Sequence, residues 1–134
     1  MTVRRLVLIA VAVVFSTTFV AAQKGGAKWV NLGQRIVTDR ADHDTIVVTA
    51  AKGTFRAVKF EVVGHAVQFH RVVIHFGSGA DQTVQMKDVI RAGGSTRDID
   101  LEGGARVIRS IDFWYDAQTI GRGGKATVRA LARE

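Results

Sequence analysis

The chain has 134 residues, and its 19 basic and 12 acidic side chains give a formal net charge of +7. This length predicts one domain. The absence of cysteine excludes a disulfide framework and a lipid anchor on cysteine. The sequence has 14 glycines and no proline, so we expect its turns to be formed by glycine.

The first 22 residues have the three regions of a secretory signal peptide. Arg4 and Arg5 form the positive start, residues 6–14 are an unbroken apolar run, and the small-residue sequence VAA ends the segment at 20–22. The apolar run is shorter than the roughly 20 residues that span a membrane. We therefore expect cleavage between Ala22 and Gln23, a flexible leader at 23–28, and a single domain at 29–134 with no membrane span. The mature protein is expected to be periplasmic or secreted.

Cleavage removes two basic residues and leaves 17 basic against 12 acidic side chains, a net charge of +5. A basic protein favours anionic partners. Here the charges are scattered singly, without a block of like charges, which is typical of a solvated surface. We expect no nucleic acid partner.

Glycines separate short segments that are rich in valine, isoleucine, phenylalanine and threonine, a pattern typical of an all-β domain. Alternation of apolar and polar residues is clear at Val58, Phe60 and Val62. No segment has a sustained helical period. The pattern predicts an antiparallel β-sandwich of seven to nine short strands, with a jelly roll as one arrangement. The candidate strands cover residues 29–37, 45–49, 54–63, 66–76, 82–90, 97–101, 107–116 and 125–131.

The segment 66–76 changes its apolar phase part-way along. Val67 and Phe69 are odd-numbered, whereas Val72, Ile74 and Phe76 are even-numbered. A β-bulge near His70–Arg71 would place all five side chains on the core face. A similar change of phase predicts a second bulge near Arg109.

Two groups of residues are candidate metal ligands. Asp39, Asp42 and Asp44 lie in one turn and carry the oxygen ligands that calcium prefers. Their spacing is not that of an EF-hand loop, and aspartate is also common in turns, so calcium binding at this turn stays open. His70 and His75 are five residues apart, which places them on opposite faces of a regular strand. We expect no required metal or other cofactor.

No catalytic residues are predicted. The mature serines are Ser78, Ser95 and Ser110. Ser78 lies between two glycines but lacks the wider motif and the strand–turn–helix setting of a nucleophile elbow. Ser95 follows two glycines and is typical of a turn. The sequence therefore favours a protein that is not an enzyme.

Residues 95–116 predict a hairpin that turns at Gly103–Gly104. A two-residue turn places Asp98 opposite Arg109, an opposite-charge pair that would fix the strand register. A three-residue loop instead pairs Leu101 with Val107. In the alternative interpretation, Arg106 and Arg109 present their guanidinium groups to a carboxylate or sulfate ligand.

Trp114 is the strongest candidate for a contact residue. It lies between Phe113 and Tyr115, so on a strand it points away from them and toward the outer face. An exposed tryptophan can stack on a sugar or mark a protein contact, although single exposed apolar residues are common.

The spaced glycine and aliphatic pattern resembles a family of short exported bacterial proteins classed as a domain of unknown function. The resemblance covers about residues 29–131 and is most specific at 99–106, which reads IDLEGGAR. It implies bacterial origin, export and one β-domain, and it supplies no activity. The segments that carry it are Leu32–Gly33, Asp42-x-Asp44-x-Ile46, Gly53-x-Phe55, Val67-x-Phe69, Phe76-Gly77-x-Gly79, 92–94, 99–106 and Gly123-x-x-Ala126.

From the sequence, we expect an exported, non-catalytic binding or accessory module of the bacterial cell envelope, with a glycan or a protein as its partner. The alternative is a structural or assembly protein that pairs through a sheet edge. An unrecognised hydrolase is the least favoured hypothesis.

Overall fold

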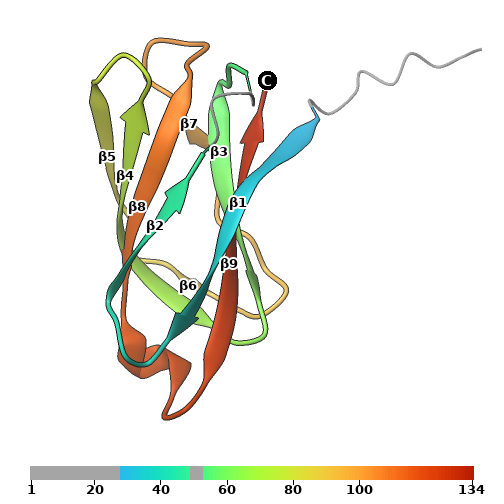
Figure 1. The fold of residues 1–134 in the computed structure, drawn as a ribbon. Coiled ribbons are helices and arrows are strands. Elements are labelled where there is room, and N and C mark those ends of the chain that lie inside the picture. The colour runs from blue at the N-terminus through green and yellow to red at the C-terminus, as the bar shows by residue number, and fades with distance from the viewer. Residues whose placement is uncertain (1–27, 49–52) are drawn as a thin grey trace, which may run out of the picture.

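A computed structural model describes residues 28–48 and 53–134, and within them nine strands form two antiparallel sheets (Figure 1). One sheet has the order β1 (Trp29–Thr38), β9 (Lys125–Arg133), β3 (Ala57–Val63) and β7 (Ile99–Asp100). The other has the order β2 (His43–Val47), β8 (Ile108–Tyr115), β4 (Val67–Phe76) and β5 (Asp81–Gln85). The short β6 (Val89–Ile90) pairs with the start of β4. The predicted signal peptide and most of the predicted leader lie outside the described residues.

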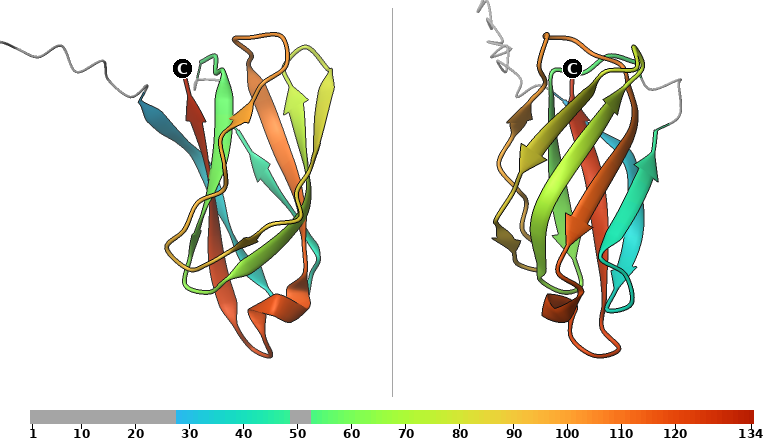
Figure 2. Two further views of the ribbon diagram at one scale, coloured as in Figure 1. Left: turned by 180° about the vertical axis from the view of Figure 1, so that it is seen from behind. Right: turned by 90° about the vertical axis from the view of Figure 1, so that its left-hand side faces the viewer.

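The predicted β-sandwich is confirmed. The two sheets lie face to face as separate layers, with β9 and β3 on one side and β8, β4 and β5 on the other (Figure 2). When the short β6 is left out, the remaining eight strands are arranged as in a jelly roll, with β1-β9-β3-β7 in one sheet and β2-β8-β4-β5 in the other. In this arrangement, strands that are distant in sequence pair with one another.

The core consists of the inward-facing residues of both sheets. Phe60 from β3 lies against Phe69 from β4 and Phe113 from β8, with ring centroids 5.7 and 6.2 Å apart. Tyr115 extends the cluster from Phe113, at 5.7 Å. Aromatic pairs at such distances stabilise a core beyond the area that they bury, and the cluster joins the two sheets without a disulfide.

Both predicted bulges are confirmed. Between β4 and β8 the register moves from Phe69 opposite Tyr115 to Arg71 opposite Trp114, so His70 is the extra residue. At the other end of this pair, the register moves from His75 opposite Ser110 to Phe76 opposite Ile108, so Arg109 is the extra residue in β8. The first bulge keeps Val67 and Phe69 on the same buried side as the later apolar residues of β4.

The predicted hairpin at residues 95–116 is wrong. β7 pairs with β3, whereas β8 pairs with β2 and β4 in the opposite sheet. Gly103 and Gly104 both have positive φ angles, 85° and 84°, but they turn a connection that crosses between the sheets. Arg106 fixes this crossing, because its backbone N–H and C=O form two hydrogen bonds with Phe55, at 2.7 and 2.8 Å.

Two further differences concern single elements. The predicted strand 82–90 is two strands, β5 and β6, separated by a loop in which Met86 is buried. A short 3₁₀ helix, η2 (Ala117–Ile120), follows β8 where no helix was expected. In the part of the chain that the structure describes, no helix is long and apolar enough to cross a membrane.

Candidate functional site

The outer surface of the β2-β8-β4-β5 sheet gathers charged and aromatic side chains from three strands. We call this surface the polar face and define it by His43, Arg71, His75, Asp112 and Trp114. Strand register produces it: His43 lies opposite Trp114, and Trp114 lies opposite Arg71 across the next pair. The bulge at His70 is essential, because it brings Arg71 opposite Trp114 and onto this surface.

Trp114 is held between two side chains. The His43 ring stacks on the indole, with centroids 4.5 Å apart and an interplanar angle of 27°. The guanidinium carbon of Arg71 lies 3.9 Å from the indole centroid. Because β8 lies between β2 and β4, His43 and Arg71 approach the indole from opposite sides. The structure therefore places Trp114 on the outer face, with its ring faces covered and its edge available for contact.

Asp112 is the centre of the hydrogen-bond network of the polar face. One carboxylate oxygen, Oδ1, bonds to Nε2 of His43 at 3.0 Å and accepts a hydrogen bond from the Thr45 hydroxyl. The other oxygen, Oδ2, bonds to Nε2 of His75 at 2.5 Å. The second nitrogen of His75, Nδ1, bonds to Asp81 at 2.7 Å. One carboxylate thus connects β2, β4 and β8, and His75 extends the network to β5.

These contacts shift the pKa values of both partners. The hydrogen bond to Asp112 raises the pKa of His75 above its ordinary 6.5, with Asp81 adding to the effect and partial burial opposing it. Burial alone would raise the pKa of Asp112, but the hydrogen bonds from Thr45, His75 and His43 outweigh burial and lower it below 3.8. The network therefore favours a protonated His75 beside an ionised Asp112.

The polar face also brings together the residue types of a hydrolase triad. Ser110 lies opposite His75 across β8 and β4, and Asp112 bonds to the same histidine. A triad histidine needs one nitrogen free to accept the proton of the serine hydroxyl. Both ring nitrogens of His75 bond to carboxylates, so the ring acts as a double donor. Neither nitrogen is therefore free to accept a proton from Ser110.

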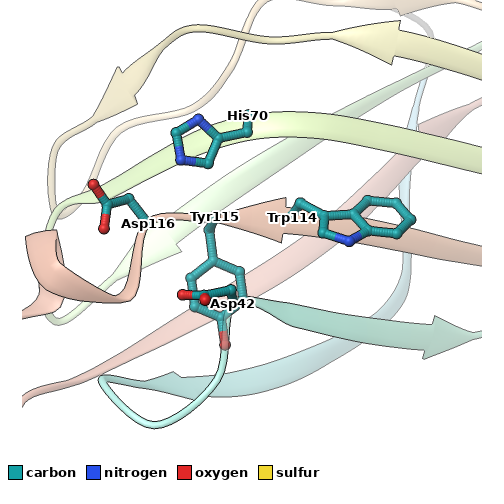
Figure 3. A pocket seen from close by; sticks show the side chains of 5 residues that line it. All are labelled: Asp42, His70, Trp114, Tyr115 and Asp116. Atoms are coloured by element: carbon teal, nitrogen blue, oxygen red, sulfur yellow. The ribbon is translucent and has the colours of Figure 1, made fainter.

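A pocket of about 400 Å³ lies beside Trp114, at the end of the sheet (Figure 3). His70, the bulge residue, and Tyr115 form part of its wall, and Asp42 and Asp116 add two carboxylates. The position of Tyr115 is fixed because its hydroxyl donates to Asp44 at 2.9 Å and its backbone N–H donates to the carbonyl of Asp42 at 3.0 Å. The pocket therefore has one firmly held wall residue, Tyr115, and several hydrogen-bond acceptors.

The structure assigns Arg106 to the connection between the sheets. Its guanidinium lies 3.9 Å from the Phe76 ring centroid, and it donates to the Glu102 carbonyl at 2.8 Å and to the Ser78 hydroxyl at 3.1 Å. It lies before β8, whereas Trp114 is near the other end of that strand. Arg106 and Trp114 are therefore not brought together.

The predicted pair of Asp98 and Arg109 is wrong, because the two residues belong to different sheets. Asp98 precedes β7 and accepts a hydrogen bond from Arg133 of β9, at 3.4 Å. Arg109 is the exposed bulge residue of β8. The cross-strand geometry needed for the pair existed only in the predicted hairpin.

The aspartates of the 39–44 turn have separate partners within the protein. Asp39 accepts a hydrogen bond from the backbone of Gly123 at 3.0 Å. Asp44 accepts from Tyr115 and from Arg35, at 2.9 and 3.4 Å. Within residues 28–48 and 53–134, no group of three histidine, cysteine, aspartate or glutamate side chains is arranged to hold a metal ion.

Sequence reasoning missed His43, Arg71, His75 and Asp112 as members of one site. The available signal was alternation, which places Asp112 on the same outer face as Trp114. Their assembly depends on which strands flank β8, and local patterns do not contain that information.

Comparisons with known proteins add a family and a solved structure with a similar fold. A family profile described as "Domain of unknown function (DUF2541)" matches residues 7–132. Comparison with curated proteins finds no match. The chain is similar in structure to AlgX from Pseudomonas aeruginosa, with a TM-score of 0.52 and 13% sequence identity. The similarity covers 82% of this chain but 27% of the AlgX chain, and at this identity it concerns the fold alone.

Proposed function

The chain belongs to the DUF2541 family, a domain of unknown function, and we propose that it is an exported, non-catalytic binding module of the bacterial cell envelope. Its ligand contacts the polar face and the adjoining pocket beside Trp114. A glycan is the favoured ligand.

Export is supported by the order of regions in residues 1–22. The family profile begins at residue 7 and so extends over the apolar segment of the leader. A signal peptide is removed on export, and the domain from Trp29 onward then carries out the function.

The observation that carries the binding proposal is the fixed arrangement of side chains on the polar face. Exposed ion pairs on a solvated surface usually contribute little to stability. Here one carboxylate connects two histidines, and Trp114 is held between a histidine and an arginine. Binding sites use such pre-organised polar and aromatic groups to fix the orientation of a ligand.

A glycan suits the pocket because the carboxylates of Asp42 and Asp116 can accept hydrogen bonds from hydroxyl groups. The edge of Trp114 supplies an apolar contact beside them.

Binding of fractionated envelope glycans to the mature domain tests this function. We expect the Trp114→Ala variant to lose at least about tenfold in affinity, since the indole lines the pocket and supports both neighbours. Trp29→Ala is the matched control, because Trp29 lies on the other sheet between Lys59 and Arg133. Equal binding by the wild type and both variants would contradict the proposal, provided that all three have the same circular dichroism.

Assembly through a sheet edge is the second candidate. β2 is an edge strand, and Val47 on it is 72% exposed. Unpaired edges are templates for strand addition. Light scattering distinguishes the two functions: self-assembly that Val47→Lys abolishes would favour the edge, whereas a monomer that binds glycan favours the polar face.

A further inference from the structure

Arg71 differs from the other arginines that have contacts in the described structure. Arg35 pairs with Asp44, Arg133 pairs with Asp98, and Arg106 donates to a carbonyl and a hydroxyl. Among residues 28–48 and 53–134, Arg71 forms neither a hydrogen bond nor an ion pair through its side chain, and its contact is the face of Trp114. Its Nε–H is buried and has no acceptor.

This arrangement leaves the hydrogen-bonding capacity of a half-buried cation unused. A guanidinium has five N–H donors in a rigid plane. The indole face attracts the charge but accepts no conventional hydrogen bond. The buried Nε–H is not accessible to a ligand, so the donors of Arg71 that a ligand can reach are the N–H groups of its two Nη atoms.

The neighbouring groups limit the chemistry of that ligand. A carboxylate matches the guanidinium fork because it accepts two parallel hydrogen bonds in one plane. Trp114, whose ring Arg71 covers, also lines the pocket together with Asp42 and Asp116, so a ligand that contacts both Arg71 and the pocket meets one cation and two acceptors. This combination suits a sugar unit that carries one carboxylate together with hydroxyl groups.

We infer that Arg71 binds the carboxylate of a sugar acid, and that the ligand of the polar face is therefore an acidic glycan. The inference rests on the proposed function, and it names the chemical class of the ligand. Trp114 is shared between the two parts of the site: it orients Arg71 on one side and borders the hydroxyl-binding pocket on the other.

The test uses the mature domain and two probes that differ in charge, trigalacturonate and its methyl ester. Two-dimensional ¹H–¹⁵N spectra report the Nε–H signal of each arginine, and the Arg71→Lys variant identifies the signal of Arg71. We expect trigalacturonate to shift the Arg71 Nε–H signal and the Trp114 indole N–H signal together. The methyl ester should bind at least about tenfold more weakly, because it cannot form the charge-assisted fork.

Two variants separate the role of Arg71 from overall charge. Arg71→Lys keeps the charge but loses the fork, so it should weaken trigalacturonate binding at least about tenfold and leave binding of the ester unchanged. Arg109→Lys is the matched control, because Arg109 is exposed at the other bulge of the same strand pair. It should bind both probes as the wild type does.

Each contrary result has a separate meaning. Equal affinity for acid and ester, with the Trp114 signal shifting, would overturn the role of Arg71 and leave the glycan-binding function standing. Binding of an oligoglutamate peptide in place of both sugars would overturn the sugar acid and favour a protein ligand. If no probe shifts either signal, the inference is wrong, and the fractionated glycans then decide the proposed function separately.

Discussion

At the scale of single residues, His75 shows most clearly how the fold sets a chemical state. It stands between Asp112 and Asp81, at 2.5 and 2.7 Å, on three adjacent strands. The pKa of His75 is raised and that of Asp112 is lowered. The pair is therefore most stabilising when the histidine is protonated and the aspartate is ionised.

The first prediction is that His75→Gln destabilises the protein in a pH-dependent way. A raised histidine pKa contributes stability that is complete below 6.5 and is lost as pH rises through the folded-state pKa. A lowered aspartate pKa contributes stability above 3.8 that is lost as pH falls through its folded-state pKa. The difference in the free energy of unfolding between the wild type and His75→Gln should thus be largest between pH 3.8 and pH 6.5. We expect it to reach about 1 kcal/mol there, because the network is partly exposed.

Urea melts at several pH values measure this difference, and Asp112→Asn is the control. That variant removes the partner whose hydrogen bond raises the pKa of His75 most, so substituting His75 in its background should have a smaller pH dependence, the part that remains being due to Asp81. A destabilisation by His75→Gln that stays constant from pH 5 to pH 9 would show that the charge state of His75 is irrelevant.

The residue scale also shows where sequence reasoning stops. Alternation sufficed to place Trp114 on the outer face, because its neighbours Phe113 and Tyr115 are core residues. The partners of Trp114 were not predictable, because His43 and Arg71 lie 71 and 43 positions before it in the sequence. Asp98 was assigned the wrong partner for the same reason: Arg133 is distant in sequence and adjacent in space.

At the scale of elements, the bulges determine which side chains reach the core and which reach the polar face. His70 lets Val67 and Phe69 share the core with Val72 and Ile74, although the two pairs differ in phase. This feature was predictable, because a strand must keep its apolar residues on one side and a change of phase has few other solutions.

The second prediction concerns the deletion of His70. A regular strand would turn Val67 and Phe69 away from the core, and both side chains are fully buried in the native fold. Losing the burial of a phenylalanine alone costs about 3 to 5 kcal/mol, a large part of the stability of a typical domain. We expect the deletion variant to melt far below the wild type or to fail to fold.

His70→Ala is the matched control, because it removes the exposed imidazole but keeps the extra residue. Substitution at such a position should change stability by about 0.5 kcal/mol or less. Thermal melts followed by circular dichroism compare the variants. A deletion variant with the native melting temperature would show that β4 does not need the bulge.

The prediction of a hairpin at Gly103–Gly104, which also concerns elements, was wrong for an identifiable physical reason. Two glycines with positive φ form a tight turn equally well within one sheet or between two sheets. The pairing of Phe55 with Arg106 decides which sheet the chain enters after the turn, and this pairing is a contact between distant parts of the chain. Local turn chemistry indicates that the chain reverses, but not which strands it then joins.

At the scale of the whole molecule, the jelly roll is built from pairs of strands that lie far apart in the sequence. β1 pairs with β9, and β2 pairs with β8. The class of fold follows from short alternating segments separated by glycine, whereas the strand order does not. The similarity to AlgX at 13% identity illustrates this separation, because two sequences with little in common adopt comparable sandwiches.

The last prediction joins the leader to this architecture. Cleavage between Ala22 and Gln23 leaves six residues before Trp29, the first residue of β1 and the partner of Arg133. The described strands and their pairings all begin after the cut, so the chain from Gln23 to Glu134 should fold without residues 1–22. Expressed with its leader in a bacterium, the protein should be recovered from the periplasm or medium with an intact mass that starts at Gln23, allowing for cyclisation of that glutamine. Ala22→Leu places a large side chain directly before the cut and should accumulate as uncleaved protein in the membrane fraction. Wild-type protein that keeps Met1 in the membrane fraction would show that the leader is a permanent anchor, and the binding face would then act at a membrane surface.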